Sequence, residues 1–385
     1  MSNASRAQVR ILKETSWGVT PAAAMTNINV VSESLGQKTT FKNSDIIRAD
    51  TNRLSPARVG IEASGGITTE LMYGGYDALI EGAMRSSFPT AVAISLTTIS
   101  ASSVDNSYNR TSGSFITDGV LVGQWIRVGG FATNAVNNGY SKVVSVAALK
   151  VVVSGRVLVT ESAGATVTMK GSLIVNGTTD QSFSLEKEFQ DISEFYSFTG
   201  MRVGSFGFDI APNSLITGSF DFQGKQATAA GATIGTGAPN SAVANKSMNA
   251  VDNVTTLFEG GSLTTLSVTK LSFKVNPNLR AQQAVGNLAN VGVGSGSIAV
   301  DGEFEVYFTS RTQLNKYLNN TGSSISFVTE EVASGAYAWD FPSITYTEGE
   351  TVIPGIDQDV YCKMKFSAFY NTALAGTLGI TKMAP

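Results

Sequence analysis

Histidine is absent from this chain of 385 residues, and cysteine occurs once, as Cys362. Without imidazole, the chain cannot carry a Ser-His-Asp or Cys-His catalytic group, nor a zinc or iron site that needs histidine ligands. A single cysteine also excludes an intrachain disulfide. Cys362 shares the apolar side of an alternating segment with Val360, Met364 and Phe366, so we expect a small buried hydrophobe on a strand, not a nucleophile.

Charged residues are scarce as well: they make up 15% of the sequence, against about a quarter in an average soluble domain. The formal net charge is −3 and no lysine or arginine run occurs, which argues against tight binding to nucleic acid phosphates. A surface poor in charge is typical of a subunit whose faces are covered by neighbours. Residues 1–11 lack the apolar core of a signal peptide and no apolar stretch approaches bilayer length, so we expect cytoplasmic synthesis without a membrane partner.

Intact nucleotide and metal motifs are also missing. The segment 218–225 only superficially resembles a phosphate-binding loop, because its glycine spacing is one residue too long and Gln226 stands where Ser or Thr would bind magnesium. Its alternating phenylalanines predict a strand that reaches a glycine turn. Asp357 and Asp359 could supply oxygen ligands to a divalent cation, but solvent-facing strand positions explain them better. We therefore predict no catalytic, cofactor-binding or metal-binding residue, and no cofactor.

Glycine, by contrast, is abundant, with 39 residues, and it is accompanied by many Ser, Thr, Asn, Val and Ala residues. With 42% hydrophobic residues, this composition predicts a globular, mainly β fold of short strands joined by Gly and Asn turns. Residues 67–73 alternate as a strand, and apolar residues then recur at helical spacing over 76–84. The same order, a strand and a short amphipathic helix, returns at 298–308 and 314–318.

A region of different composition, residues 94–176, interrupts the first of these units. Its start is rich in Ser and Thr. Short Val-rich segments separated by Gly and Asn turns follow at 124–128, 141–146, 151–153 and 165–169. Strands spaced this closely predict a small β-barrel or sandwich that is inserted as a separate domain.

The order of strand, helix and paired strands suggests an internal duplication, although two weak copies also arise by chance in β proteins. The paired-strand segments would be 205–225 and 343–369. A further echo joins 205–213 to 270–278, since both alternate and end in Pro-Asn. We predict three units: a first module at 1–93 and 177–260 with an N-terminal arm, an inserted domain at 94–176, and a second module at 261–385.

Two long segments have weak strand and helix signals. Residues 36–58 carry charges of both signs and form either an extended arm that pairs with a neighbouring subunit or a solvated loop. Residues 227–245 consist almost entirely of Ala, Gly, Thr, Asn and Ser. Because they have too little apolar content to pack, we expect a loop that is mobile or becomes ordered on a partner.

Residues 13–21, Lys-Glu-Thr-Ser-Trp-Gly-Val-Thr-Pro, resemble the start of the major tail tube proteins of siphophages, the bacteriophages with long non-contractile tails. The resemblance covers most of the chain outside 94–176. It continues at 32–35, 47–48, 65–77, 202–206 and 215–220. Residues 118–139 look like a small β domain that is inserted in several such proteins.

This resemblance implies a structural subunit and not an enzyme. It implies tail-tube-type β-sandwich/barrel modules with two sheets and one short helix each, whose sheets close a wide barrel between neighbours. Rings would stack into a hollow tube around the tape measure protein and meet tail terminator and tip proteins at its ends. The genome would pass through the lumen without specific binding, in a virion tail that is assembled in the host bacterial cytoplasm. With two modules per chain, we favour a trimeric ring of pseudo-sixfold symmetry over a hexamer, with residues 94–176 facing outward.

Three other functions are open to this sequence. The first is another virion structural protein, such as a capsid-decorating or tail-tip protein, which has a similar composition but does not explain the opening motif. The second is a carbohydrate-binding adhesin whose inserted domain binds glycans. The third is a β-sandwich hydrolase that uses carboxylates such as Asp357 and Asp359.

Overall fold

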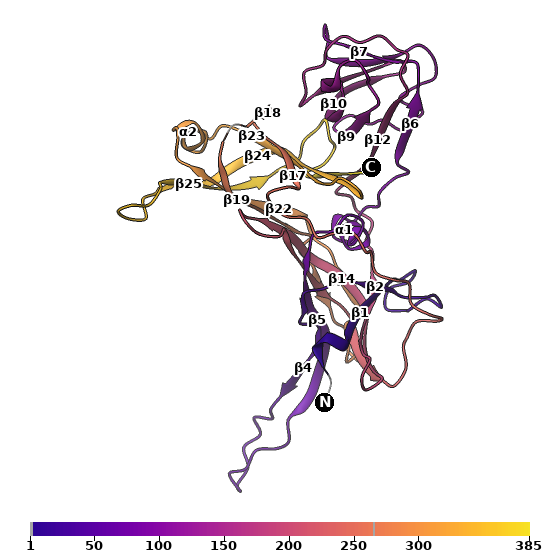
Figure 1. The fold of residues 1–385 in the computed structure, drawn as a ribbon. Coiled ribbons are helices and arrows are strands. Elements are labelled where there is room, and N and C mark those ends of the chain that lie inside the picture. Colours follow the sequence, from indigo (N-terminus) through magenta and orange to yellow (C-terminus); the bar gives the residue numbers. More distant parts are fainter. Residues whose placement is uncertain (1–2, 265) are drawn as a thin grey trace.

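The computed structural model describes residues 3–264 and 266–385. Twenty-six β-strands and two short α-helices lie in these residues, so the fold is mainly β, as predicted. The molecule is angular and carries three projections: a small domain, a hairpin lobe built from β24 and β25, and a long arm that continues β4 and β5 (Figure 1). All pairs of named strands are antiparallel, which suits a chain whose successive strands are joined by short turns.

The elements fall into three groups along the chain. The first part contains β1 (Ala7–Lys13), β2 (Thr26–Ile28), β3 (Ser32–Glu33), β4 (Gly36–Lys42), β5 (Ala57–Glu70), α1 (Asp77–Met84), β13 (Phe183–Phe189), β14 (Glu194–Ile210), β15 (Thr217–Gln223) and β16 (Gln226–Ala230). The small domain contains β6 (Val92–Leu96), β7 (Ile99–Ser102), β8 (Ser107–Arg110), β9 (Trp125–Gly129), β10 (Gly139–Ala147), β11 (Lys150–Ser154) and β12 (Val167–Val175). The last part contains β17 (Val254–Glu259), β18 (Ser262–Leu263), β19 (Val268–Asn276), β20 (Arg280–Gln282), β21 (Gly292–Gly294), β22 (Ala299–Tyr307), α2 (Thr312–Leu318), β23 (Ser323–Glu331), β24 (Gly335–Val352), β25 (Tyr361–Ala368) and β26 (Gly379–Met383).

The central sheet runs through both parts in the order β4, β5, β15, β14, β19, β22, β25 and β24. Its two longest strands, β14 and β24, each belong to two sheets. The first half of each lies in an outer sheet, and the second half lies in the central sheet beyond a β-bulge. A bulge bends a strand and increases its twist, which is how one strand serves two layers.

The two parts repeat one set of pairings. In the first, β13 pairs with β1 and β14, β14 pairs with β15 and β16, and β5 pairs with β4 and β15. In the last, β23 pairs with β17 and β24, β24 pairs with β25 and β26, and β22 pairs with β19 and β25. The bulges coincide as well, between Val203 and Ser205 in β14 and between Tyr346 and Glu348 in β24. By its pairings, β24 is thus the counterpart of β14, and β19 is the counterpart of β3 and β4.

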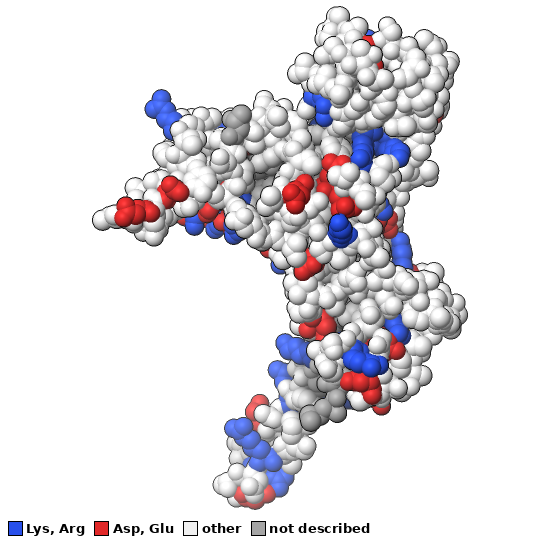
Figure 2. Space-filling model, in the orientation of Figure 1, with Lys and Arg blue, Asp and Glu red and all other residues white. Residues whose placement is uncertain are grey.

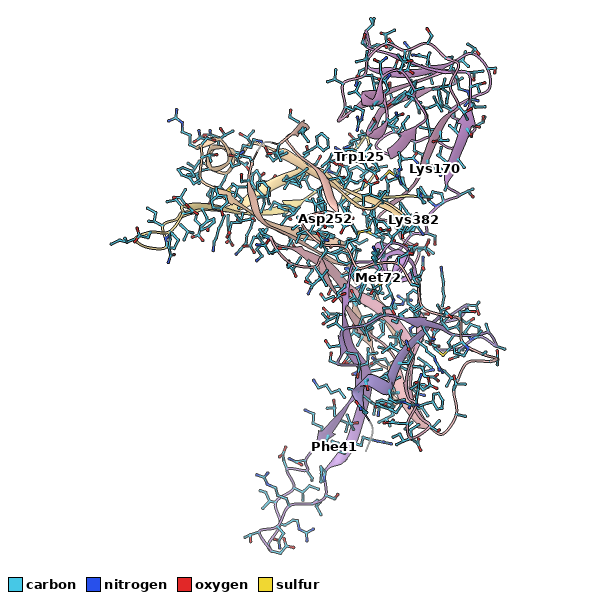
Figure 3. The ribbon with its side chains drawn as sticks, in the orientation of Figure 1. Phe41, Met72, Trp125, Lys170, Asp252 and Lys382 are labelled. Atoms are coloured by element: carbon cyan, nitrogen blue, oxygen red, sulfur yellow. The ribbon has the colours of Figure 1, made fainter. Side chains whose placement is uncertain are left out.

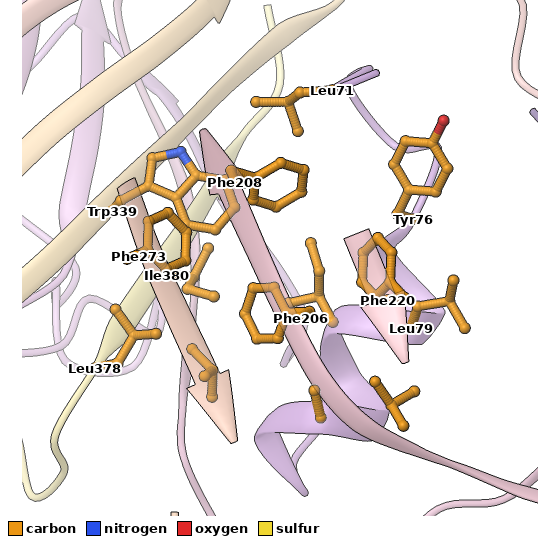
Figure 4. Close-up of a cluster of buried hydrophobic side chains, with 14 of the residues drawn as sticks. Leu71, Tyr76, Leu79, Phe206, Phe208, Phe220, Phe273, Trp339, Leu378 and Ile380 are labelled. Carbon is orange, nitrogen blue, oxygen red and sulfur yellow. The ribbon is translucent and has the colours of Figure 1, made fainter. Parts of the chain in front are cut away.

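The core lies between the central sheet and the elements that cover one of its faces. Aromatic side chains dominate it, including Phe206, Phe208, Phe220, Phe273 and Trp339, all almost fully buried (Figure 4). Phe208 and Trp339 lie 5.3 Å apart between ring centroids and belong to different parts of the chain. Because this cluster is shared, the two parts form one packed body.

Helix α1 follows from the predicted spacing. Leu79, Ile80, Ala83 and Met84 are buried on one face, and the helix ends at Arg85, whose left-handed φ of 52° terminates it. The second predicted helix is α2, which buries much less of its surface, since Leu318 is 65% exposed. Both helices therefore form where apolar periodicity predicts them, but α1 buries more of its residues than α2 does.

The small domain has a hydrophobic core of its own, formed by residues between Val92 and Met169. The four Val-rich strands predicted there are β9 to β12, and three more, β6 to β8, lie in the Ser/Thr-rich start where no strand was predicted. Strand β12 runs out of this domain and pairs with β26. The domain is therefore joined to the last part of the chain by backbone hydrogen bonds as well as by side chains.

Two predictions were wrong. The segments 205–213 and 270–278 are not counterparts, because they lie mostly in β14 and β19, which pair with each other side by side. The loop 227–245 is ordered on its own chain: its first residues form β16, the Asn240 N–H donates to the Met25 carbonyl (2.8 Å), and Asn29 donates to the Val243 carbonyl (2.8 Å). Backbone polar groups hold this segment, so its low apolar content did not reveal its order.

Candidate assembly interface

The junction between the two parts of the chain is a continuous strand pairing. Residues 206–210 of β14 pair with residues 271–275 of β19, from Phe206 opposite Val275 to Ile210 opposite Leu271. One four-stranded unit (β4, β5, β15, β14) is joined edge to edge to a second such unit (β19, β22, β25, β24). Antiparallel pairing at an edge satisfies every backbone group along it, so this junction needs no special side chains.

A polar cluster locks the same junction behind the sheet. The Tyr337 hydroxyl donates to the Asp77 carboxylate at the start of α1, and it accepts from the Gly74 N–H (2.8 Å). Lys382 of β26 pairs with the same carboxylate and lies 5.0 Å from the Tyr73 ring centroid. Burial, reinforced by the negative charge of Asp77, raises the pKa of Tyr337 well above its ordinary value, so the hydroxyl stays a donor.

The strap, residues 277–298 between β19 and β22, also crosses the junction. It folds back over the first part of the chain, where the Leu288 carbonyl accepts from the Ile61 N–H (3.0 Å) and the Ser295 hydroxyl donates to Asp180 (2.7 Å). Asp180 also pairs with Arg202 and Arg85. Partial burial raises the pKa of Asp180, but the Ser295 hydrogen bond and the two guanidinium groups outweigh it and lower that pKa overall.

The two outer edges of the central sheet are left without a partner strand in residues 3–264 and 266–385. On one side, β4 pairs only with β5. On the other side, the part of β24 after residue 344 pairs only with β25. These edges are the counterparts of the two edges that meet in the junction, β19 and the second half of β14. A long unpaired edge is a template for pairing with another chain.

The arm, residues 43–56, connects β4 to β5 and projects from the first edge. All its side chains are exposed except that of Ser44, and they include Ile46 at 68% and Ile47 at 98%. Phe41 lies near its base, where the hairpin leaves the body (Figure 3). Charged side chains of both signs gather over this projection (Figure 2), but of those on the described arm only Arg48 and Asp50 form an ion pair. Exposed apolar residues on an extended hairpin are typical of a surface that another protein covers.

The face of the central sheet opposite the core is polar. Lysines there form four ion pairs with acidic residues. Three of them join adjacent strands, Lys270–Glu303, Lys363–Glu305 and Lys365–Glu348, and the fourth, Lys274–Asp221, reaches across β14. Asp209 of β14, Asp301 of β22 and Glu350 of β24 also lie on strands of this sheet and have no ion pair among the residues that the structure describes. Acidic groups therefore outnumber basic ones on these strands.

The opening segment is tied down by Glu14, which is buried. Its Oε2 accepts from the Gly18 N–H (2.7 Å) and the Ser182 hydroxyl (2.7 Å). Its Oε1 accepts from the Ser184 hydroxyl (2.8 Å) and the Gly200 N–H (2.8 Å). Four donors stabilise this carboxylate, which has no cationic partner among residues 3–264 and 266–385, and they connect the N-terminal segment to β13 and β14.

Trp17, from the same segment, extends that contact. Its indole N–H donates to the Gly200 carbonyl (3.0 Å), and the Lys225 ammonium lies 5.6 Å from its ring centroid. Gly18 adopts a φ of +73°, and a Cβ there would come within 3.0 Å of the Lys225 side chain. The sequence Glu-Thr-Ser-Trp-Gly is thus a structural clasp, which the residue types alone did not reveal.

The small domain docks against the last part of the chain through charge and aromatic contacts. Lys142 pairs with the buried Asp340 (2.7 Å), which also accepts from the Ser326 hydroxyl (2.5 Å). Trp125 lies at this boundary (Figure 3), with its ring centroid 5.4 Å from that of Phe258. A cavity of about 300 Å³ remains between the two surfaces. These contacts hold the domain in a fixed orientation.

The candidate chemical residues occupy ordinary structural positions. Cys362 is buried in β25, and burial raises the pKa of its thiol. Asp357 and Asp359 lie in the exposed turn between β24 and β25, and residues 218–223 lie in β15. Within residues 3–264 and 266–385, no group of three or more Asp, Glu or Cys side chains could hold a metal ion. Neither helix in this part of the chain has the length and apolar character to cross a membrane.

Open sheet edges, a projecting arm and a polar sheet face are typical of a structural protein, which acts through contacts with other proteins. The chain matches the family described as phage tail tube protein over residues 4–368, nearly its whole length. It therefore belongs to the phage tail tube family, and the resemblance seen in the sequence is confirmed. No curated protein was found to match it. Membership gives the chain a structural role in the tail tube of a bacteriophage virion.

Proposed function

We propose that three copies of this chain close a ring and that stacked rings form the hollow conduit through which the phage genome leaves the virion. The junction within the chain is the observation that supports this. It joins two equivalent four-stranded units through the edges β14 and β19. The counterparts of these two edges, β24 and β4, are left unpaired at the ends of the sheet. Repeating one junction around an axis closes a ring whose members are all equivalent.

The repeated pairings support two modules per chain that arose by duplication. The second module would begin with β17 and not at residue 261, because β17 occupies beside β23 the place that β1 occupies beside β13. Three chains would then supply six modules, with true threefold and approximate sixfold symmetry. Helix α2 is more exposed than α1 in the single chain. In such a ring, the neighbouring chain would cover α2.

The polar face of the central sheet would line the bore of the tube. Its excess of acidic groups repels nucleic acid phosphates, so DNA would pass without binding. During assembly the same face would surround the tape measure protein. The small domain (residues 94–176) projects from the other side of the molecule (Figure 1), so it would face outward. The arm would reach a neighbouring copy, and tail terminator and tip proteins would cap the stack in the host cytoplasm.

Electron microscopy of the purified protein tests this function. We expect spontaneous hollow tubes whose rings show three projecting lobes, one small domain from each chain. Six lobes per ring would show that each ring contains six chains and would contradict the trimer. Protein that stays monomeric at high concentration, with and without tape measure protein, would overturn the conduit itself.

A further inference from the structure

One backbone position on the β3–β4 edge is occupied by side chains. Leu35 follows Ser34, whose N–H donates to the Gly66 carbonyl of β5 (2.8 Å), so the N–H and C=O of Leu35 point away from β5 toward the open edge. The Leu35 N–H donates to the Glu33 carboxylate (2.8 Å), and the Leu35 carbonyl accepts from the Lys187 ammonium (2.7 Å). Glu33 and Lys187 also pair with each other (2.9 Å). One ion pair therefore satisfies both groups that an incoming strand would need.

The counterpart of Leu35 in the last part of the chain is Phe273. Glu33 pairs with Ile67 of β5, and Leu271 pairs with Phe304 of β22, at equivalent positions of the two units. Two residues further along each strand, Leu35 therefore corresponds to Phe273. No side chain of the described residues forms a hydrogen bond with the Phe273 backbone. Its backbone lies against β14, opposite Phe208.

The neighbouring residue of β14 shows how close this approach is. A Cβ added to Gly207 would lie 2.4 Å from the Phe273 carbonyl oxygen. The position equivalent to Leu35 therefore accepts a strand in the junction, while Leu35 itself has its backbone groups covered by Glu33 and Lys187.

From this comparison we propose that the Glu33–Lys187 pair is a removable cap on the edge that receives β24 of a second copy. The inference rests on the proposed ring. The counterpart of Phe208 in β24 is Thr351, because Phe208 pairs with Gly218 as Thr351 pairs with Cys362. Residues 349–353 of one copy then lie antiparallel to residues 33–37 of the next, with Thr351 opposite Leu35. Pairing there exchanges two charge-assisted hydrogen bonds for backbone ones.

The cap is firmly held, which gives it an effect on assembly. Lys187 belongs to β13, and its ammonium lies 5.7 Å from the ring centroids of both Tyr196 and Phe198. Its side chain is 13% exposed, and that of Glu33 is 27% exposed. A subunit whose own side chains cap the backbone groups of its edge strand resists nonspecific edge-to-edge association. Strand pairing at this edge is then favourable only with a partner that also makes the other ring contacts.

The test compares Glu33→Gln and Lys187→Met with the unaltered full chain. We expect both variants to form tubes at a subunit concentration about two- to five-fold lower, the range that a pair of this exposure is worth. Light scattering gives the onset, and sedimentation gives the subunit concentration left in solution. Glu303→Gln is the matched control, because it breaks the Lys270–Glu303 pair on the sheet face (3.0 Å) and should leave the concentration unchanged.

Unchanged or higher concentrations for both variants, with normal tubes, would overturn the cap and leave the conduit intact. If no protein forms tubes, including the unaltered chain, the proposed function fails first. Thermal unfolding and circular dichroism identify a variant that has lost its fold. Glu33→Asp is then the gentler variant, since it keeps the charge but withdraws the carboxylate from the Leu35 N–H, and it should also lower the concentration.

Discussion

Tyr337 and Asp77 lie 260 residues apart in the sequence, and the hydroxyl of the first donates to the carboxylate of the second at the junction between the two parts of the chain. The same hydroxyl accepts from the Gly74 N–H (2.8 Å). Tyr337→Phe leaves that N–H and one carboxylate oxygen without this partner while it keeps the ring. We expect the free energy of unfolding to fall by about 1–3 kcal/mol.

Chemical denaturation measures this change. Tyr370→Phe is the control, since Tyr370 is 60% exposed and its hydroxyl has no partner within the described residues. Equal stabilities of the Tyr337→Phe variant and the unaltered chain would show that the polar cluster contributes nothing to the junction.

Glu14 predicts a strong effect of a nearly isosteric change. In Glu14→Gln, an amide NH₂ replaces one carboxylate oxygen and cannot accept from the backbone N–H at that oxygen, which is that of Gly18 or of Gly200. This N–H is then buried without an acceptor, which costs about 1–3 kcal/mol, whereas the serine hydroxyl at the same oxygen can turn to accept from the amide. The measurement is the midpoint of urea unfolding, with the exposed Glu194→Gln as the matched control, for which a change within about 0.5 kcal/mol is expected.

Asp180 makes the attachment of the strap sensitive to acid. Its pKa in the folded chain is lowered, so its contribution to stability is present above the unfolded value of about 3.9 and is lost as pH falls through the folded value. We expect residues 277–298 to exchange amide hydrogens faster below about pH 4 than at pH 6, after correction for intrinsic rates. In Asp180→Asn, this excess should already be present at pH 6. An equal pH response in both proteins would contradict the prediction.

The Lys142–Asp340 pair predicts a difference between single and double replacement. Lys142→Met leaves the Asp340 carboxylate, which is 1% exposed, with Ser326 as its remaining donor and should destabilise the docking by about 3–5 kcal/mol. Lys142→Met combined with Asp340→Leu removes both charges and should recover most of the loss. Thermal unfolding of the single and double variants measures both effects. A double variant no more stable than Lys142→Met would contradict this account.

The arm can be removed without touching the core. Replacement of residues 43–56 by Asn-Gly joins β4 to β5 through a two-residue turn. The removed side chains are nearly all exposed, so we expect stability to change by no more than about 0.5 kcal/mol. Tube formation, followed by sedimentation, should be lost. Normal tubes from this variant would exclude the arm from the contacts between copies.

Local sequence patterns predicted many of the helices and strands, but they did not predict which strands pair with each other. Helices α1 and α2 and strands β9 to β12 follow from periodicity within a few residues, and the absence of histidine excluded whole classes of chemistry. The echo between 205–213 and 270–278 misled because neighbours in a sheet share alternation and turn residues just as copies do. Which strands pair, and which edges stay open, depends on contacts between distant residues that no local pattern contains.

The clasp at Glu14 and the cap at Leu35 show the same limit at single residues. Glu14 stands in the sequence as one acid among small polar residues, and only the fold brings Ser182, Ser184 and Gly200 to it. Glu33 and Lys187 are 154 positions apart. Neither arrangement leaves a spacing that sequence analysis could have found.

Strand β12 has a mechanical consequence. It begins in the core of the small domain and pairs with β26, and β26 pairs with β24 of the last part of the chain. No flexible spacer separates these pairings, so a load applied to the small domain is carried by rows of hydrogen bonds perpendicular to the strands and reaches β24 directly. A pull on the small domain therefore acts directly on β24, since nothing between them can stretch first.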